Sequence, residues 1–299
     1  MIVLVQSPGR MGNKLWTLAN VLAFCMENGA DFVHADMHGL HRVRRAFLSS
    51  QRRHRGSALS RAWLKLARKM RLHDSLAVRP REYVDLDQSC ELKALVRERR
   101  VVQLAGYYLA APKSLTKHRD EVVKALRFDP DILREAASIR AATFKKDSLN
   151  VAMHMRRGDY REFLGGMLCY SDEAYQSVAD LVQAASDRPV RFHLFSDESI
   201  SEGRFSRHDV MAHRGNLPEL DLAIMASCDA IVGPSSSFSQ WASFIGNVPI
   251  HVLEPDTVSR LSELTALPEP GFGVFGPYRF GEKAAARLAA SAALVPSLT

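Results

Sequence analysis

The chain has 299 residues, of which 46% are hydrophobic and 24% are charged, and its formal net charge is +7. These proportions are ordinary for a globular protein of one or two domains, and no internal repeat or low-complexity tract is present. No apolar stretch reaches the length of a membrane-spanning helix, and the short apolar start lacks the cationic residues of a signal peptide. The four cysteines are far apart, which argues against a zinc site and predicts free thiols of a reducing compartment.

The first residues predict a strand, a glycine loop and a helix, as at the start of a Rossmann-like domain. The strand covers residues 1–5. Gly9 and Gly12 let the backbone turn tightly or approach a ligand, while Arg10 and Asn13 can project above the strand end. This is not the dinucleotide fingerprint, because the third glycine and the ribose-binding acid are missing.

Positive charge is concentrated in residues 42–81, between Arg42 and Arg81, where thirteen Lys and Arg residues accompany the single acid Asp74. The apolar and basic positions of residues 62–72 predict an amphipathic basic helix suited to an anionic membrane surface. A solvated helix that covers its own domain is an alternative of equal weight. Nucleic acid is the runner-up partner, but no recognised nucleic-acid motif accompanies the segment.

Two Asp-x-Asp sequences could in principle hold a divalent metal. They are Asp85-Leu86-Asp87 and Asp129-Pro130-Asp131. The pattern is short enough to occur by chance, and neither copy follows a convincing apolar strand. No metal site is therefore expected.

A short apolar strand, residues 151–155, ends in the adjacent arginines Arg156 and Arg157 and a glycine turn. Arginine carries a permanent charge on a planar fork that can grip a phosphate through two parallel hydrogen bonds. The strand end therefore predicts a site for a nucleotide diphosphate. A solvated loop or a structural ion pair is the alternative interpretation.

Residues 220–244 predict a helix, a short strand, a Gly-Pro break and a second helix. Three serines, Ser235, Ser236 and Ser237, open that second helix. Free backbone N–H groups, the helix dipole and the hydroxyls together make a natural phosphate site. The alternative is that one serine merely caps the helix, as most serines at this position do.

Strand-like and helical stretches alternate along the chain, which indicates an α/β protein with parallel sheets. The predicted strands are residues 1–5, 101–105, 151–155, 192–195, 230–232 and 249–253, and the first helical pattern covers residues 15–27. A polar stretch, residues 144–150, predicts a boundary between two domains, residues 1–147 and 148–299.

Four segments together resemble the α-1,2-fucosyltransferase family, glycosyltransferase family 11 and its relatives, which uses GDP-fucose. Gly9-Arg10-Met11-Gly12-Asn13 is similar to the family's Gly-x-x-Gly-Asn-Gln loop, and His154-Met155-Arg156-Arg157-Gly158-Asp159-Tyr160 matches its His-x-Arg-Arg-Gly-Asp-Tyr motif throughout. Phe195-Ser196-Asp197-Glu198 resembles its Phe-Ser-Asp-Asp strand end. The block from Glu219 to Trp241 resembles its acidic helix and Asn-Ser-Ser-Phe-Ser-Trp-Trp sequence.

The chain also departs from the family's pattern. Lys14 stands in place of glutamine, Gly233-Pro234 in place of Ala-Asn, and Gln240 in place of the first tryptophan. These positions lie beside the expected sugar or acceptor, whereas the phosphate-binding parts are intact. GDP-type binding is therefore better supported than fucose, and fucose better than any particular acceptor or linkage.

The resemblance implies a GT-B-like fold, with two facing Rossmann-like domains of which the carboxyl-terminal one holds the nucleotide sugar. It implies inverting, metal-independent transfer of fucose from GDP-fucose to a hydroxyl of a glycan or lipid-linked glycan, with no cofactor. A cytoplasmic enzyme, peripheral at the inner face of the membrane, is consistent with residues 42–81. The alternatives are another nucleotide sugar, a transferase that binds without reacting, and a non-catalytic phosphate- or nucleic-acid-binding protein that acts through residues 42–81.

The expected catalytic residues are Arg156, Asn13 and Arg10. The expected donor-binding residues are His154, Arg156, Asp197, Ser235, Ser236, Ser237, Phe238, Gly9 and Gly12, and none is a metal ligand. Arg156 would clamp the pyrophosphate together with the serines, and Arg157 could instead turn inward and brace the loop through an acid. His154 either orients the nucleotide or packs in its strand, and Asp197 is placed at the ribose or guanine. The general base stays open among Asp159, Glu162, Asp197 and Glu219.

Overall fold

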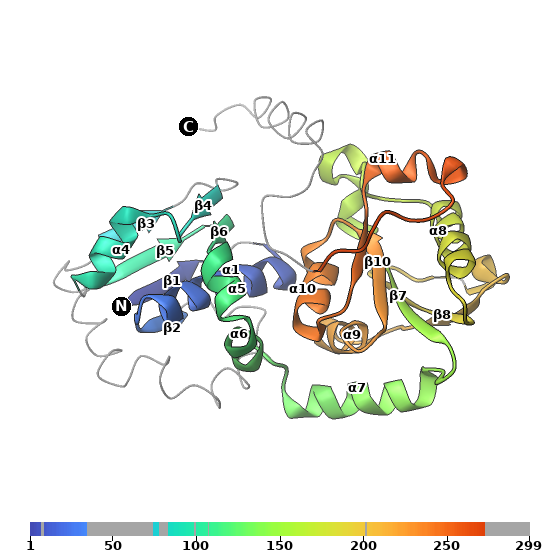
Figure 1. The fold of residues 1–299 in the computed structure, drawn as a ribbon, viewed down its shortest axis with the longest axis horizontal. Helices are drawn as coiled ribbons and strands as arrows, with labels where there is room; N and C mark the ends of the chain where they lie inside the picture. Colours follow the sequence, from blue (N-terminus) through green and yellow to red (C-terminus); the bar gives the residue numbers. More distant parts are fainter. Residues whose placement is uncertain are drawn as a thin grey trace. The chain divides into compact units, whose positions relative to one another are not determined.

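The computed structural model describes residues 1–6, 9–34, 74–77, 83–98, 100–106, 108–200 and 202–272. These residues form two compact units that divide after Pro130 (Figure 1). The sequence placed the boundary at residue 147, whereas in the structure the stretch that starts at Asp131 belongs to the second unit. Of the basic segment, only residues 74–77 are described, so the predicted helix over residues 62–72 lies outside the described residues.

Every strand pair described in the first unit is parallel. Its four-stranded sheet has the order β2-β1-β5-β3, and β4 pairs with β6 separately. The strands are β1 (Ile2–Gln6), β2 (Phe32–His34), β3 (Asp74–Ala77), β4 (Tyr83–Asp85), β5 (Val102–Ala105) and β6 (Tyr108–Ala110). The helices are α1 (Met11–Glu27), α4 (Cys90–Arg97), α5 (Pro112–Lys117) and α6 (Arg119–Ala125).

Helix α1 is the buried helix of the first unit. It begins at Met11, four residues before the predicted start at Leu15, because its first turn takes in Gly12 and Asn13. The buried Asn20 ties α1 to the end of β6: its Oδ1 accepts from the backbone N–H of Ala111 at 2.7 Å, and its Nδ2 donates to the carbonyl of Trp16 at 2.9 Å. The strand, loop and helix predicted at the amino terminus are therefore present.

The second unit contains a five-stranded parallel sheet with the order β11-β10-β7-β8-β9. The strands are β7 (Leu149–Met155), β8 (Val190–Ser196), β9 (Asp209–Ala212), β10 (Ala230–Pro234) and β11 (Ile250–Leu253). The helices are α7 (Pro130–Thr143), α8 (Asp172–Ala185), α9 (Pro218–Met225), α10 (Ser237–Gly246) and α11 (Pro255–Val258), with short 3-10 turns η1 (Gly158–Arg161), η2 (Phe163–Gly166), η3 (Glu202–Phe205) and η4 (Leu261–Glu263). All six predicted strands are confirmed.

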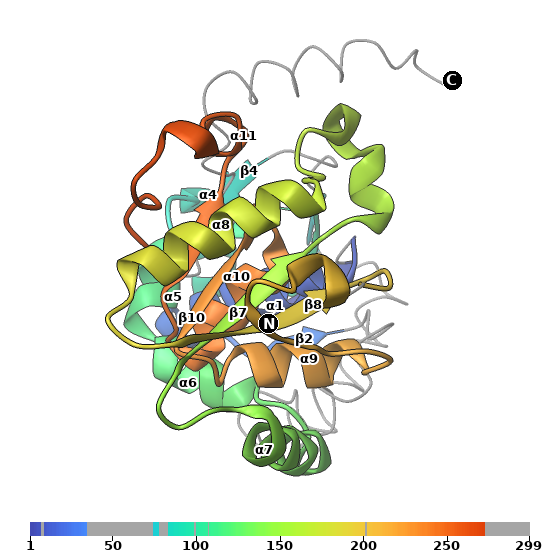
Figure 2. The ribbon, with the colours of Figure 1, turned by 90° about the vertical axis from the view of Figure 1, so that its right-hand side faces the viewer.

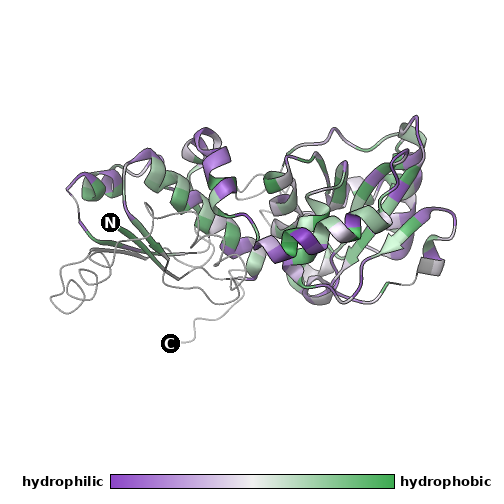
Figure 3. Cartoon of the chain, turned by 90° about the horizontal axis from the view of Figure 1, so that it is seen from below, coloured by the Kyte–Doolittle hydropathy of each residue, from purple (hydrophilic) through white to green (hydrophobic). Residues whose placement is uncertain are grey.

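Helices cover both faces of this sheet, with α8 on one side and α9 on the other (Figure 2). Alternate residues of β7, Val151, Met153 and Met155, belong to the same apolar core as Tyr175 and Val178 of α8. The hydropathy colouring shows mainly apolar strands and more hydrophilic outer helices and loops (Figure 3). No helix among the described residues is long and apolar enough to cross a membrane.

The strand order locates the point where this sheet changes direction. From β7 the chain proceeds through β8 to β9 on one side, whereas β10 and β11 lie on the other side of β7. Loops that follow β7 and β10 therefore lead away in opposite directions. In open parallel sheets, ligands bind at such a switch point, outside the carboxyl ends of the strands. Both phosphate-binding motifs predicted from the sequence lie there.

Candidate functional site

Arg156 is the first residue after β7, and two carboxylates hold its side chain. Its Nη2 donates to Asp159 Oδ1 at 2.6 Å, and its Nη1 lies 3.0 Å from Asp197 Oδ2. The guanidinium also lies over the Tyr160 ring, 5.6 Å from the ring centroid. The Arg156 side chain is 15% exposed, so it is fixed at the strand end and still reachable from solvent.

Asp197, at the end of β8, also fixes the backbone of the arginine loop. Its Oδ1 accepts from the backbone N–H of Arg157 at 2.9 Å. Glycine at residue 158 leaves room for this carboxylate, because a Cβ there would overlap with Asp197 Oδ2. This carboxylate therefore serves the loop, and the expected contact of Asp197 with a ribose or guanine stays a prediction.

Arg157 turns inward and braces the loop through Asp172, the first residue of α8. Arg157 Nη2 and Arg204 Nη1 donate to the two oxygens of this carboxylate, which is only 6% exposed. Burial alone would raise the pKa of Asp172, but hydrogen bonds from both arginines hold it below its usual value. The expected brace is confirmed. Its acid was missed, because the sequence shows only a helix start after Ser171.

The three serines lie at the start of α10, as the sequence predicted. Ser236 is the cap residue, and its Oγ accepts from the backbone N–H of Phe238 at 3.3 Å. Ser235 precedes the cap, and Ser237 is the first helical residue. Tyr160 joins this helix start to the arginine loop, because its hydroxyl donates to the Ser235 carbonyl at 3.0 Å while its ring lies under Arg156.

His154, on β7, is 3% exposed and packs against Phe238, with ring centroids 5.5 Å apart. Burial, helped by the charge of Arg156, lowers the pKa of His154 to about 3, so the ring is neutral at pH 7. Its buried Nδ1 has no hydrogen-bond partner among the described residues. Gly233 of β10 permits the close approach of β10 to β7 at His154, because a Cβ there would lie 2.8 Å from the His154 carbonyl oxygen. Gly233, which stands where the family has alanine, therefore has a structural reason.

The predicted residues of the amino-terminal loop lie in the first unit. Gly9 has a φ of +93°, in the region that favours glycine. Arg10 precedes the first residue of α1, and Gly12 and Asn13 lie in its first turn. The expected approach of Arg10 and Asn13 to a sugar held by the second unit stays a prediction.

The first Asp-x-Asp sequence has a structural role. Asp87 Oδ2 accepts from the backbone N–H groups of Lys113 at 2.8 Å and Ser114 at 3.1 Å, so it caps the start of α5. Asp85 accepts from the backbone N–H of Asp87 at 2.9 Å. Within the described ranges, no group of three or more His, Cys, Asp and Glu side chains could hold a metal ion. All four cysteines are free thiols, as expected.

Asp221 is an ionisable residue to which the sequence assigned no separate role. It lies in the first turn of α9, and its Oδ1 accepts from Asn216 Nδ2 at 2.9 Å. Burial raises the pKa of Asp221 to about 6, and the hydrogen bond from Asn216 opposes this shift. A carboxyl with this pKa can change its protonation state near neutral pH.

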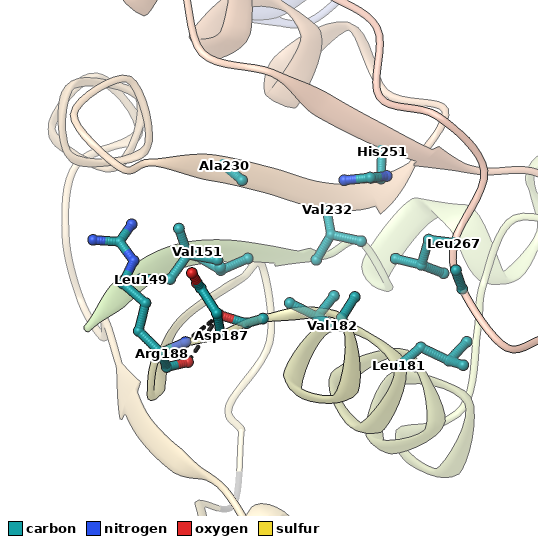
Figure 4. Close-up of a pocket in the computed structure, with 13 residues that line it drawn as sticks. Leu149, Val151, Leu181, Val182, Asp187, Arg188, Ala230, Val232, His251 and Leu267 are labelled. Carbon is teal, nitrogen blue, oxygen red and sulfur yellow. Dashed lines mark hydrogen bonds between the residues drawn. The ribbon is translucent and has the colours of Figure 1, made fainter.

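A pocket of about 300 Å³ lies between α8 and strands β7, β10 and β11 (Figure 4). Its walls are mainly apolar, and they include Leu149 and Val151 at the start of β7 and Val232 of β10. Arg156 follows the opposite end of β7. None of the residues predicted for the site lines this pocket.

No protein-family model matches the sequence, and no curated protein matches it. Solved structures do resemble the fold. A POFUT1 complex with GDP has a TM-score of 0.52 and 16% identity, covering 83% of this chain and 97% of that chain. NodZ fucosyltransferase from Bradyrhizobium has a TM-score of 0.50 and 14% identity, covering 90% and 97%. A variant of Arabidopsis thaliana FUT1 with GDP has a TM-score of 0.51 and 10% identity, covering 85% and 70%. The expected α/β, GT-B-like fold with parallel sheets is thereby confirmed.

Proposed function

We propose that the protein is a fucosyltransferase that uses GDP-fucose as its donor. One observation carries the proposal: Tyr160 joins Arg156, after β7, to the serine-rich start of α10, after β10. A permanent cation and the N–H groups at the start of a helix thus come together at the switch point of a parallel sheet, where ligands bind in such folds. The matching sequence motif and the structural likeness to GDP-bound fucosyltransferases favour GDP and fucose as the ligand.

The proposed reaction is a direct displacement with inversion. A hydroxyl of the acceptor glycan forms a bond to the anomeric carbon of fucose, and the bond from that carbon to the diphosphate breaks. GDP leaves with the electron pair, and the hydroxyl proton passes to a base or to water. Arg156 and the N–H groups at Ser236 and Ser237 would stabilise the charge that develops on the leaving diphosphate. This set needs no divalent metal for that task.

The finer parts of the proposal rest on the sequence. The His-x-Arg-Arg-Gly-Asp-Tyr match favours an α-1,2 linkage, and Arg10 and Asn13 are proposed to contact the reacting sugar. A glycan or lipid-linked glycan is the proposed acceptor. The basic residues 42–81 support a cytoplasmic enzyme, peripheral at an anionic membrane face, whose acceptor is presented there.

The first test is a calorimetric titration with GDP, UDP and ADP, with and without a chelator. We expect GDP-selective binding that the chelator leaves unchanged and that Arg156→Ala abolishes. Arg161→Ala is the matched control, because Arg161 lies in the turn η1, which follows Arg156 and Arg157, but pairs with Glu198 at the surface. The Arg156→Ala protein should also lose about a hundredfold to a thousandfold in the rate of fucose transfer to an acceptor glycan.

Other outcomes favour the alternatives. UDP-selective binding would assign the site to another nucleotide sugar, and binding that needs a metal would contradict the proposed stabilisation of the leaving group. Binding without transfer to any glycan would favour a degenerate transferase. No nucleotide binding, together with nucleic-acid or phosphate binding lost on substitution within residues 42–81, would favour the non-catalytic protein.

A further inference from the structure

Helix α8 contacts the carboxyl end of β7 at two points, one on each side of Arg156. Tyr175 of α8 is fully buried, and its hydroxyl donates to the His154 carbonyl at 3.2 Å. Asp172, in the first turn of the same helix, holds the Arg157 side chain. Residues that are three apart lie on the same face of a helix, so both contacts come from one face of α8. The position of Arg156 is thereby tied to the start of α8.

The hydroxyl of Tyr175 bonds to β7 at the point where the strand is paired on one side only. Paired residues of β7 and β8 continue to Met155, whereas those of β7 and β10 end at Met153. His154 is therefore the first residue of β7 beyond its pairing with β10. Burial raises the pKa of Tyr175 well above its usual value, so the hydroxyl keeps its proton and is a donor at neutral pH.

A second tyrosine, Tyr170, makes the same kind of contact with a different strand. Its hydroxyl donates at 2.8 Å to the carbonyl of Leu253, the last residue of β11. The rings of Tyr170 and Tyr175 lie in one apolar core, with their centroids 6.3 Å apart. None of the residues assigned to the donor site lies on β11. Two neighbouring hydroxyls thus hold two strand ends, and only the strand held by Tyr175 leads to Arg156.

We propose that Tyr175 is a positioning residue of the donor site, which fixes the end of β7 from which Arg156 reaches the diphosphate. This inference rests on the proposed function, because it takes Arg156 as the group that receives the diphosphate. Tyr175 is fully buried, so it acts through the His154 backbone and not by contact with the donor.

The substitution Tyr175→Phe removes this hydroxyl and keeps the ring in the core. Without the hydrogen bond, the strand end gains freedom that the ligand has to remove again on binding. We expect GDP to bind about fivefold more weakly, which corresponds to one ordinary hydrogen bond. Tyr170→Phe loses a bond of the same kind from β11 and should bind GDP as the wild-type protein does. Both variants should show a similar decrease in the urea midpoint, because each loses one hydrogen bond of the core.

The experiment is a calorimetric titration of the wild-type, Tyr175→Phe and Tyr170→Phe proteins with GDP, together with urea denaturation of all three. Weaker GDP binding by Tyr175→Phe alone, at similar urea midpoints of the two variants, would support the positioning role. A hydroxyl that merely stabilised the fold would lower the midpoint and leave the GDP affinity unchanged. If the wild-type protein binds GDP and Tyr175→Phe binds it equally well, or if Tyr170→Phe loses as much affinity, the positioning role is wrong and the proposed function stands. If the wild-type protein does not bind GDP, both proposals are overturned.

Discussion

Two polar clusters lie among the apolar strands of the second unit. Each pairs its buried polar groups, one through opposite charges and the other through hydrogen bonds between uncharged groups. The arginine cluster, at the carboxyl ends of the strands, contains Arg156, Arg157, Asp159, Asp172 and Asp197, and every charge in it faces an opposite charge. The histidine cluster contains Asn150, His193 and His213, and it is held by hydrogen bonds between uncharged groups. Charge is thus concentrated where an anion is proposed to bind.

The contacts of the histidine cluster fix the position of each proton. Asn150 Nδ2 donates to the carbonyls of Lys145 and Ser148, so Asn150 Oδ1 is an acceptor. His193 Nε2, 3.2 Å from that oxygen, must donate to it. The Nδ1 of the neutral ring then accepts from His213 Nε2, 3.0 Å away. Burial lowers the pKa of His193 to about 3 and that of His213 to about 4, so both rings are neutral at pH 7.

The largest effect on stability is expected from breaking the buried ion pair. Asp172→Ala removes the carboxylate that pairs with Arg157. The Nε of Arg157 is already buried without a hydrogen-bond partner in the described structure. Removing one partner of such a pair destabilises a protein by about 3 to 5 kcal/mol. Urea denaturation at pH 7 measures this loss. GDP binding should weaken with it, because Arg157 braces the loop that carries Arg156.

Two companion variants show whether the loss comes from the unpaired charge. Arg204→Ala removes the other partner of Asp172, but Arg204 is 62% exposed, so we expect a loss below about 1 kcal/mol. Arg157→Met combined with Asp172→Leu removes both buried charges and should recover most of the stability lost in Asp172→Ala. Equal losses in the single and the double variant would contradict the argument.

The next effect is acid sensitivity of the histidine cluster. A histidine with a pKa of about 4 in the folded protein and near 6.5 in the unfolded chain binds its proton more readily when unfolded. The contribution of the neutral histidine to the free energy of unfolding is therefore complete above pH 6.5, and it declines as the pH falls toward 4. From pH 7 to pH 5 the loss is about 2 kcal/mol for each such histidine.

His213→Gln separates this titration from the hydrogen bond, because the glutamine amide can still donate to His193 Nδ1. We expect the stability difference between pH 7 and pH 5, measured by urea denaturation, to shrink by about 2 kcal/mol in this variant. An unchanged difference would mean that His213 titrates normally in the folded protein.

The sequence could predict the features that have a local signal, and it missed the contacts that only packing creates. The strands and the two phosphate-binding loops have local signals: an apolar run that ends in Arg156, and serines after Gly233-Pro234. The parallel sheet then brings these loops together. Asp172 and Arg204 have no such signal, because the pairing of Asp172 with Arg157 and Arg204 depends on how α8 and η3 pack. The histidine cluster was missed for the same reason, since its members become neighbours only through strand pairing.

Short strands and the first turn of α1 were also beyond sequence reasoning. Strands β2, β4 and β6 have three residues each, too few for a hydrophobic period, and their pairing partners decide that they are strands. Gly12 and Asn13 disfavour helix, yet both lie inside α1, where burial against the unit outweighs local preference.

A smaller effect is expected where Asp197 meets the loop. In Gly158→Ala the new Cβ overlaps with the Asp197 carboxylate, which has to shift and lose its hydrogen bond from the Arg157 backbone. Such overpacking destabilises a protein by about 1 kcal/mol or more. GDP binding should weaken, because Arg156 loses one of the two groups that position it. Gly165→Ala is the comparison variant, because a Cβ at residue 165 would enter open space. The φ of +66° at this residue adds backbone strain, but Asp197 is not displaced. Unchanged GDP affinity in Gly158→Ala would show that Asp197 does not position Arg156.

The smallest effect is expected at the rim of the arginine cluster, and it tests whether burial or charge gives the cluster its importance. Arg161 and Glu198 form a two-point ion pair, with Nη2 to Oε2 at 2.5 Å and Nε to Oε1 at 3.2 Å. Their side chains are 59% and 34% exposed, so water already solvates both charges. Glu198→Gln should therefore change the free energy of unfolding by less than about 1 kcal/mol, in contrast to Asp172→Ala. If urea denaturation showed Glu198→Gln and Asp172→Ala to be equally destabilised, geometry rather than burial would determine how much these ion pairs contribute to stability. A small loss at Glu198 beside a large one at Asp172 would show that the buried ion pairs, and not the exposed ones, stabilise the arginine loop.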